Sequence, residues 1–521
     1  MTSIRKYIFT VMAAALAVSC ARDLGNYTYH DLESPAVSGI GERIEVLTQE
    51  RLQISPVIEN IPDTEMYEYE WQAIDKNIDM TSTVIGTGRD LDYIVTLSPA
   101  EYALYYKITE KSSGIYWMTE STLIVSSSMT EGWMVLCSDN GTSRLDFISD
   151  VTGITYTDVL KDNEGMPRLN GPRKIHWQNT MADLNSPYYL FTDDGATRLG
   201  KDSFEWEKEY SMQYEMASLQ EVTPYSMVSA GFGRLFVSGT DAYYSETMGI
   251  AGLFGSPVNK GFRSSPYIGA NVSGVQYAAV YMLYDMDNKK FMAYCPLLTK
   301  NDLGAQEPLT EMDEMGIIAE GFAKEGEASV VGTAFSSYPE GYGLVYMENT
   351  LYDPGNGKMG ITYSILSDGD RRYVYGIQLG DMLRFSDCTY VLGKAYYGDI
   401  SSCQGITDGN ALFAFSSLKG YMYYALGNTV YCADLNEEPI QGKPMLTFSG
   451  ENITMLKFNL YHQTANRMRS YDLVVGTEKN GTGTLRVYEG YESEGDFSNV
   501  VPDVYSGFAT IVDATYKERV N

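Results

Sequence analysis

The chain has 521 residues and is strongly acidic, with 68 Asp and Glu residues against 38 Lys and Arg residues and a formal net charge of −30. This length is enough for roughly two to four domains, each able to bury its own hydrophobic core. The negative field of such a chain repels polyanions, so the composition disfavours binding to nucleic acids and to anionic membrane surfaces.

The first 19 residues have the pattern of a bacterial lipoprotein signal peptide. Two basic residues precede an apolar run, which is too short to be a membrane-spanning helix of about 20 residues. Ser19 and Cys20 resemble the end of a lipobox, which predicts cleavage before Cys20 and a diacylglycerol on its thiol. We expect residues 1–19 to be the signal peptide and residues 20–27 a lipidated tether that holds the chain at a membrane. An ordinary signal peptide followed by an unrelated cysteine is the alternative.

Residues 28–127 have the strand pattern of a small β-sandwich. The stretch YEYEWQAID places alternating aromatic residues, Trp71 among them, on one face of a strand. The stretch YALYYKIT, which begins at Tyr102, alternates in the same way. A central-strand tryptophan followed by such a strand fills the core of an immunoglobulin-like sandwich, so we expect Trp71 and Tyr102 to be core residues. YALYYKIT also resembles a strand of polycystic-kidney-disease (PKD) domains, although the WDFGDG signature of those domains is absent.

Residues 131–521 contain a recurring hairpin pattern. Each copy combines an aliphatic strand, an Asx or Gly turn and an aromatic strand, and the copies recur roughly every 55 residues. Seven copies are found, at residues 132–149, 188–200, 233–246, 279–295, 361–379, 420–435 and 471–490. Hairpins at this spacing predict an all-β domain in the form of a β-propeller with about seven blades. A stack of separate sandwiches is the structural alternative.

The end of the chain predicts how this domain closes. The stretch SGFATIVDATYKER, residues 506–519, has the pattern of an innermost strand, yet no hairpin follows it. The first hairpin, at 132–149, conversely lacks such a strand before it. We therefore predict that Ile511–Tyr516 pairs with that hairpin, which would close the propeller and remove its exposed edges.

The sequence contains none of the common catalytic or phosphate-binding motifs, such as GxSxG, HExxH or a phosphate loop. Its three histidines are scattered and its cysteines far apart, so we expect no metal, no cofactor and no catalytic site. Asp-rich turns at 193–195 and 285–288 predict hairpin turns rather than calcium loops, because they lack the spaced ligands of an EF-hand. Cysteines in apolar runs are expected to be buried, and a disulfide between Cys388 and Cys403 stays an open alternative.

Three aromatic residues are candidates for ligand binding. Trp177 in KIHWQNT and Tyr396 and Tyr397 in GKAYYGD lie in stretches that do not fit a hairpin, which places them in loops. Exposed aromatic rings in loops supply stacking surface at a low cost in conformational entropy. Packing between blades is the alternative role for all three.

Four segments together resemble the PKD-like family lipoproteins of Gram-negative gut bacteria: DLGNYTYHDL, YEYEW, YLFTDDGATRLGKDSFEW and YSGFATIVDATYKER. The resemblance implies an outer-membrane protein, exposed at the cell surface or held in the periplasmic leaflet, whose gene lies beside a pair of outer-membrane importers. It implies a non-catalytic accessory that binds a nutrient, a glycan or a peptide, or a partner protein, for TonB-dependent uptake such as polysaccharide utilization. Cys20 is the one residue whose role the resemblance carries over.

Two other functions remain open at this stage. A propeller can act as a glycoside hydrolase or lyase when two carboxylates from different blades converge in its channel at the separation that acid–base chemistry requires. The chain can also serve as a purely structural component of an outer-membrane complex.

Overall fold

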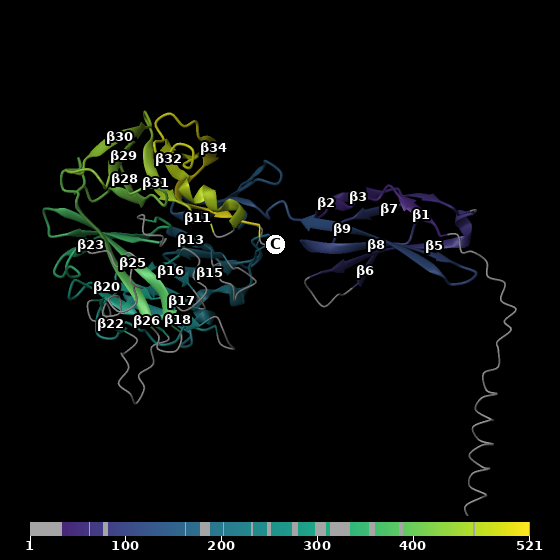
Figure 1. Cartoon of the computed structure of the whole chain (residues 1–521), viewed down its shortest axis with the longest axis horizontal. Coiled ribbons are helices and arrows are strands. Elements are labelled where there is room, and N and C mark those ends of the chain that lie inside the picture. Colours follow the sequence, from purple (N-terminus) through teal and green to yellow (C-terminus); the bar gives the residue numbers. More distant parts are fainter. Residues whose placement is uncertain are drawn as a thin grey trace, which may run out of the picture. The chain divides into compact units, whose positions relative to one another are not determined.

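A computed structural model of the chain (Figure 1) describes residues 34–61, 63–76, 82–161, 163–177, 188–201, 203–230, 233–246, 252–272, 280–296, 309–312, 334–353, 360–384, 389–461 and 464–519. The chain divides into two compact units, Met1–Ser126 and Ser127–Asn521. The regular secondary structure of both units in these ranges is β-strand apart from a few short 3-10 helices, which confirms the predicted all-β class. Cys20 and Cys388 lie outside the described residues.

The first unit is built on a five-stranded sheet in the order β2-β9-β8-β5-β6. Its strands are β2 (Arg43–Leu47), β9 (Tyr116–Ser126), β8 (Ala100–Glu110), β5 (Tyr67–Asp75) and β6 (Ser82–Gly86). Two further strand pairs complete it, β1 (Ala36–Ser38) with β4 (Val57–Glu59) and β3 (Arg51–Ile54) with β7 (Leu91–Ile94).

The core of the first unit lies between the large sheet and these strand pairs. The fully buried Trp71 ring lies 4.3 Å from the ring of Tyr106, and its indole N–H donates to the Gly88 carbonyl at 3.1 Å. Tyr102 is also buried, and its hydroxyl donates to the Ser98 carbonyl at 2.8 Å. Leu52 of β3 packs into the same cluster. The prediction that Trp71 and Tyr102 are core residues is confirmed.

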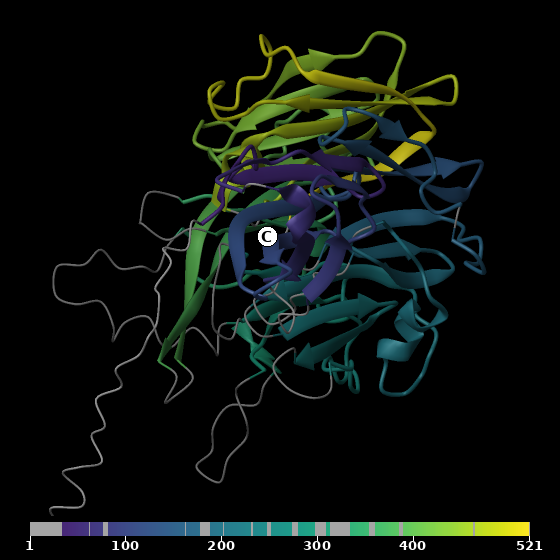
Figure 2. The same ribbon diagram turned by 90° about the vertical axis from the view of Figure 1, so that its right-hand side faces the viewer.

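The second unit contains, within the described ranges, seven antiparallel sheets that follow one another along the chain (Figures 1 and 2). The first three are β12-β11-β10-β35, β13-β14-β15 and β16-β17-β18. Their strands are β10 (Gly132–Asp139), β11 (Thr142–Ser149), β12 (Thr155–Tyr156), β35 (Thr510–Lys517), β13 (Pro172–Trp177), β14 (Tyr188–Thr192), β15 (Gly195–Leu199), β16 (Pro224–Ala230), β17 (Gly233–Ser238) and β18 (Asp241–Glu246).

The remaining four sheets each have four strands in sequential order. Their strands are β19 (Gly269–Ala270), β20 (Tyr281–Asp285), β21 (Lys290–Tyr294), β22 (Leu309–Glu311), β23 (Gly343–Asn349), β24 (Thr362–Ser367), β25 (Arg372–Arg384), β26 (Thr389–Asp399), β27 (Leu412–Phe415), β28 (Tyr421–Leu426), β29 (Thr429–Asp434), β30 (Gly442–Thr447), β31 (Asn452–Phe458), β32 (Leu473–Lys479), β33 (Thr482–Tyr488) and β34 (Asp503–Phe508). All seven predicted hairpins are paired strands in these seven sheets.

Turn residues set the register of these hairpins. Between β10 and β11, Asn140 and Gly141 have φ of 52° and 88°, the left-handed conformation that a two-residue type I′ turn requires at both positions. Between β20 and β21, the Asp285 carboxylate accepts the backbone N–H groups of Asp287 at 2.8 Å and Asn288 at 2.9 Å. This side chain closes its own turn, so the predicted hairpin at 285–288 is confirmed.

The last strand of the chain belongs to the first sheet of the second unit. β35 pairs antiparallel with β10, with Tyr516 opposite Trp133 and Ile511 opposite Cys137. The Trp133 and Tyr516 rings meet edge to face at 5.4 Å. The predicted pairing of Ile511–Tyr516 with the 132–149 hairpin is therefore confirmed.

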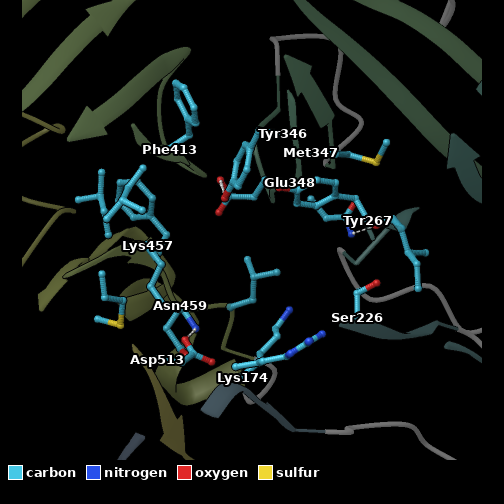
Figure 3. A pocket seen from close by; sticks show the side chains of 18 of the residues that line it. Lys174, Ser226, Tyr267, Tyr346, Met347, Glu348, Phe413, Lys457, Asn459 and Asp513 are labelled. Atoms are coloured by element: carbon cyan, nitrogen blue, oxygen red, sulfur yellow. Dashed lines mark hydrogen bonds and ion pairs between the residues drawn. The ribbon is translucent and has the colours of Figure 1, made fainter. Parts of the chain in front are cut away.

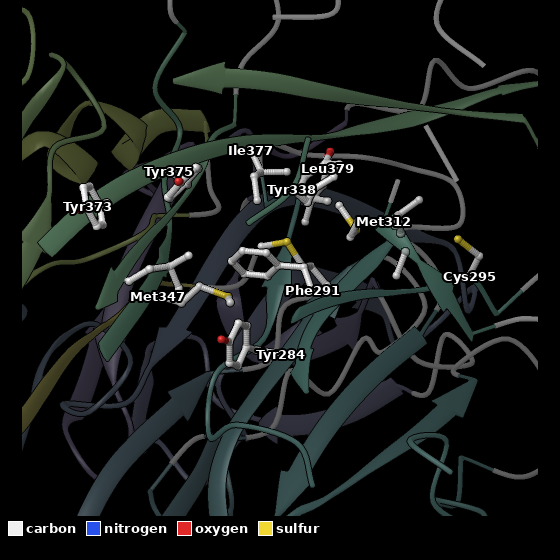
Figure 4. Packing of buried hydrophobic residues seen from close by; sticks show 14 residues of the cluster. Tyr284, Phe291, Cys295, Met312, Tyr338, Met347, Tyr373, Tyr375, Ile377 and Leu379 are labelled. Carbon is white, nitrogen blue, oxygen red and sulfur yellow. The ribbon is translucent and has the colours of Figure 1, made fainter. Parts of the chain in front are cut away.

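The hydrophobic core of the second unit is divided into seven clusters, each packed between two sheets. One of them, shown in Figure 4, packs Tyr284 and Phe291 of one sheet against Met347 and Ile377 of the next. Another joins the last sheet to the first, because it contains Trp133 together with residues of β32 and β33. Cys137 and Cys295 are buried in these clusters, as predicted for small apolar residues, whereas Cys432, for which the same was predicted, is only partly buried. Cys403 is a buried free thiol.

We expect truncation after Ser506, which removes β35, to destabilise the second unit strongly. The change would expose the edge of β10 and open the cluster around Trp133. Thermal unfolding followed by circular dichroism should show a fall of many degrees or no folded second unit. Truncation after Arg519 keeps β35 and serves as the control, and equal melting temperatures for both truncations would contradict the role given to β35.

Candidate functional site

A cavity of about 690 Å³ lies inside the second unit, and all seven sheets contribute to its wall. The lining residues come from β13, β16, the segment around β19, β23, β27, β31 and β35. The first sheet takes part only through β35, the strand added from the end of the chain. The volume falls in the range of about 300–1,000 Å³ that is typical of small-molecule sites.

Charged side chains from four strands extend into this cavity (Figure 3). They are Lys174 of β13, Glu348 of β23, Lys457 of β31 and Asp513 of β35. Strands rich in apolar residues carry three of these residues, Glu348, Lys457 and Asp513, in the stretches GLVYMEN, NITMLKF and TIVDATYK. A charge in such a strand is costly to bury unless it is paired or faces a polar space.

Asp513 connects three strands. Its Oδ1 accepts from the Lys457 ammonium at 2.8 Å, and its Oδ2 accepts the backbone N–H of Ile175 at 2.9 Å. The hydroxyl of Thr515, two residues further along β35, donates to the Ile175 carbonyl at 3.4 Å. Both oxygens of this carboxylate are therefore engaged in holding β35 to β31 and β13.

Glu348 is a carboxyl group with a raised pKa. Its Oε2 accepts the backbone N–H of Phe415 at 2.7 Å and the hydroxyl of Tyr346 at 3.2 Å. Burial raises the pKa of Glu348 to about 7, although these two hydrogen bonds and the charge of Lys457 act in the opposite direction. The same burial, with Glu348 nearby, raises the pKa of Tyr346 well above its ordinary value. Near neutral pH the carboxyl of Glu348 therefore exists in both protonation states.

Lys174 is the cation of the cavity wall that lacks a partner. Among the described residues, none forms a hydrogen bond or an ion pair with its ammonium group. Burial lowers the pKa of Lys174, and the charge of Lys457 lowers it too, while Asp513 and Glu348 act in the opposite direction. The ammonium thus stands in a polar space that a ligand could share.

Aromatic rings form another part of the wall. The Tyr346 ring lies 5.6 Å from the ring of Tyr267 at a steep angle and 5.7 Å from the ring of Phe413. Tyr267, Tyr346 and Phe413 all line the cavity (Figure 3). Ring faces of this kind offer apolar contact area, while the charged groups supply orientation.

A second, more open pocket of about 550 Å³ lies elsewhere in this unit. Five aromatic residues line it, namely Phe335, Tyr338, Tyr342, Tyr375 and Tyr397. Lys394 extends along the same segment, because its ammonium donates to the Ser336 carbonyl at 2.8 Å and lies 5.0 Å from the centre of the Tyr338 ring.

The three aromatic candidates from the sequence occupy three different environments. Trp177 is buried on β13 and lines the central cavity. Tyr396 packs between sheets, where its hydroxyl donates to the Leu435 carbonyl at 2.7 Å and its ring contacts Tyr363. Tyr397 is 43% exposed and lines the second pocket. The expectation of loops was wrong, because Trp177 is the last residue of β13 and Tyr396 and Tyr397 lie in β26, and these strands pair with β14 and β25.

Sequence reasoning missed the charged residues of the central cavity. Lys174, Glu348, Lys457 and Asp513 come from four different sheets, and their strands are not part of the recognisable hairpins. A single charged residue in a strand rich in apolar residues was the available signal for Glu348 and Lys457, and the strands of Lys174 and Asp513 each carry a second charged residue. Within the described ranges, no group of three or more His, Cys, Asp or Glu side chains is placed to hold a metal ion.

Comparison with known proteins finds a family model that matches the first part of the chain. Residues 20–172 match the model of the PKD-like family, which confirms the predicted resemblance over this segment. The segment covers the described strands of the first unit and continues to the start of β13 in the second. No curated protein matches the sequence. No helix among the described residues is both long enough and apolar enough to cross a bilayer.

Several solved structures resemble most of the chain at low sequence identity. A quinonprotein alcohol dehydrogenase-like protein from Bacteroides thetaiotaomicron is 13% identical, with 93% of this chain and 99% of that chain covered and a TM-score of 0.41. A DUF4784 family protein from Bacteroides caccae is 8% identical, with coverages of 92% and 98% and a TM-score of 0.29. Hsv2p from Kluyveromyces lactis is 7% identical, with coverages of 73% and 99% and a TM-score of 0.33.

We expect Asp513→Ala to destabilise the second unit by about 3 kcal/mol, because it leaves a buried backbone N–H and the Lys457 ammonium without their acceptor. Urea unfolding would measure the loss. Glu437→Ala is the matched control, since it breaks an equally short ion pair with Lys443 whose side chains are 45% and 67% exposed. The control should cost less than about 1 kcal/mol, and equal losses in both variants would contradict the structural role of Asp513.

We expect the stability of Glu348→Gln relative to the natural chain to rise with pH. The pKa of this carboxyl is about 7 when folded against 4.5 when exposed, so the folded chain binds the extra proton between these values. The natural chain therefore loses stability as the pH rises from about 5 to 8, whereas the amide has no proton to lose. Melting temperatures across this range test the difference, with the exposed Glu221→Gln as control. A difference that stays constant with pH would contradict the raised pKa.

Proposed function

We propose that this chain is a lipid-anchored protein of the outer membrane, exposed at the cell surface, that binds a nutrient ligand in the central cavity of its second unit. In this proposal the ligand is a glycan or a peptide, and the chain is a non-catalytic accessory to a TonB-dependent import system. The first unit serves as a PKD-like spacer between the lipid on Cys20 and the binding unit.

The second unit is, in this proposal, a seven-bladed β-propeller with the sheets as blades. The sequential order of the sheets and the hydrophobic cluster between each sheet and the next support this architecture. The cluster around Trp133 and the pairing of β35 with β10 support closure between the last blade and the first. Propellers of this type surround a central channel, which is where the cavity lies.

The observation that carries the binding function is the composition of the cavity wall. It combines an apolar aromatic surface, represented by Tyr346 and Phe413, with an unpaired ammonium at Lys174 and a titrating carboxyl at Glu348. A largely preformed hollow with a few polar groups that converge is the usual form of a small-molecule site.

The membrane anchor rests on the signal sequence. The basic residues, the short apolar run and Ser19 before Cys20 have the pattern of a lipobox. The PKD-like match also begins at residue 20, the predicted first residue of the mature chain. The acidic chain would be repelled by anionic headgroups, which favours the lipid as the attachment.

A hydrolase or lyase is the second candidate, because Glu348 and Asp513 are carboxyl groups from different sheets that line one cavity. Acid–base catalysis needs a second carboxylate that is free to act on water or on the substrate. Both oxygens of Asp513 are instead bound, to Lys457 and to the Ile175 N–H. This engagement favours binding over catalysis.

We expect the mature chain without its lipid, residues 21–521, to bind members of a glycan and peptide array and to leave them chemically unchanged. Ser226→Trp should abolish this binding, since Ser226 lines the central cavity and a bulky ring would fill it. Ser336→Trp fills the second pocket and should leave binding intact. Isothermal titration would measure both, with melting temperatures to confirm folding. Binding that survives Ser226→Trp, or mass-spectrometric evidence of a cleaved ligand, would contradict the proposal.

We expect Cys20→Ala to abolish metabolic labelling with a palmitate analogue and to release the chain from the membrane fraction. The reason is that the thiol is the proposed attachment point of the lipid. Ser19→Ala, which keeps a small residue before the cysteine, is the control. Labelling that persists in Cys20→Ala would contradict the anchor.

A further inference from the structure

We infer that the ligand of the central cavity carries a carboxylate, and that the ammonium of Lys174 binds it. This inference rests on the proposed function, because it specifies the chemistry of the ligand that the cavity takes. It concerns a small organic acid group, which a sugar acid and a peptide C-terminus both provide.

The first step compares Lys174 with the other cations of the cavity wall. Lys457 is neutralised by Asp513 at 2.8 Å. Arg173 donates to the Asp193 carboxylate at 2.6 Å, and Arg372 donates to the Gly369 carbonyl at 3.3 Å. Lys174 has no such partner among the described residues, so an anion that enters the cavity meets an unpaired positive charge there.

The second step is the free energy of that charge. An ammonium removed from bulk water without a counter-ion is destabilised, and the lowered pKa of Lys174 reflects this burial. An anion placed beside it removes the penalty and gains a charge-assisted hydrogen bond, which contributes roughly 1.5–3 kcal/mol. The unpaired ammonium of Lys174 therefore favours the binding of an anion at this position.

The third step explains why a carboxylate fits better than a larger polyanion. The cavity is lined by three acidic residues, Glu348, Asp408 and Asp513, and the chain has an overall charge of −30, so a ligand with several negative charges is repelled. A single negative charge is balanced by Lys174 alone. The rest of such a ligand meets the Tyr346 and Phe413 rings and the carboxyl of Glu348, which donates or accepts a hydrogen bond according to its protonation state.

The bulge in β13 directs Lys174 into this position. The pairing of β13 with β14 shifts register between Pro172 and Lys174, so the chain has one extra residue there. Arg173 then reaches Asp193 and lies 4.5 Å from the centre of the Tyr225 ring, while Lys174 faces the cavity. Bulges of this kind re-aim a side chain next to a site.

Isothermal titration of residues 21–521 with matched pairs of probes tests the inference. The pairs are D-glucuronate with D-glucose, and glycylglycine with its C-terminal amide. We expect at least one acid to bind about tenfold or more tightly than its neutral partner, because the neutral partner lacks the charge that Lys174 pairs with. Preference within the first pair identifies a sugar acid, and preference within the second identifies a peptide C-terminus.

Variants separate the role of Lys174 from general effects of charge. Lys174→Met keeps an apolar stem and should weaken binding of the acid by about tenfold to a hundredfold, whereas Lys174→Arg should retain part of it. Lys443→Met, an exposed lysine paired with Glu437 outside the cavity, should leave binding unchanged. The ligand-free Lys174→Met chain should also melt at a higher temperature than the natural chain, since it no longer holds a partly buried ammonium without a counter-ion.

The outcomes distinguish this inference from the function on which it rests. Acid and neutral probes that bind equally, acids that fail to bind to folded protein at millimolar concentration, or an acid that binds Lys174→Met as tightly as the natural chain would each overturn it. A neutral ligand that Ser226→Trp excludes but Lys174→Met accepts would overturn the inference and leave the proposed cavity function standing. Binding that Ser226→Trp does not affect would contradict both the inference and the proposed function of the cavity.

Discussion

The second unit depends on one pairing, that of its last strand with its first hairpin. β35 adds to β10, and through Asp513 it also bonds to β13 and β31. A chain of sheets that did not close in this way would leave β10 as a free edge and expose the cluster around Trp133. Because β35 comes from the end of the chain, residues more than 330 positions apart in sequence must meet. Bringing them together costs loop-closure entropy, and the burial of apolar surface offsets this cost.

The pairing of β35 with β10 explains why a residue that stabilises the fold also lines the cavity. Asp513 faces the cavity, yet both of its oxygens hold strands together, and this leaves Lys457 neutralised as well. Lys174 and Glu348 line the same cavity, and no hydrogen bond or ion pair joins these two side chains. Asp513 and Lys457 therefore form a pair that stabilises the fold, whereas Lys174 and Glu348 are the two charged groups that a ligand could contact. A substitution in the first pair is expected to affect stability, whereas one in the second is expected to affect recognition.

Local patterns predicted much of this fold, and the limits of local patterns explain what was missed. Asn-Gly turns such as Asn140–Gly141 and alternating strands are encoded within a few residues, so the seven hairpins and the core role of Trp71 followed from them. The cavity residues lie on strands outside those hairpins, and their convergence depends on seven sheets. The different partners of Arg173 and Lys174, which both line the cavity, depend on a one-residue bulge in β13 that has no signature in the sequence.

The acidity of the chain and the cation in its cavity act together on selectivity. A surface with a net charge of −30 raises the free energy of any anion that approaches it, and the effect grows with the charge of the ligand. Salt screens this repulsion over roughly 8–10 Å, whereas Lys174 acts within a partly desolvated cavity where screening is weak. For the carboxylate ligand inferred above, a small monoanion would meet little repulsion outside the cavity and would gain a charge pair inside it, whereas a polyanion would be repelled more strongly. An acidic exterior combined with the unpaired ammonium of Lys174 would therefore select ligands by total charge as well as by shape.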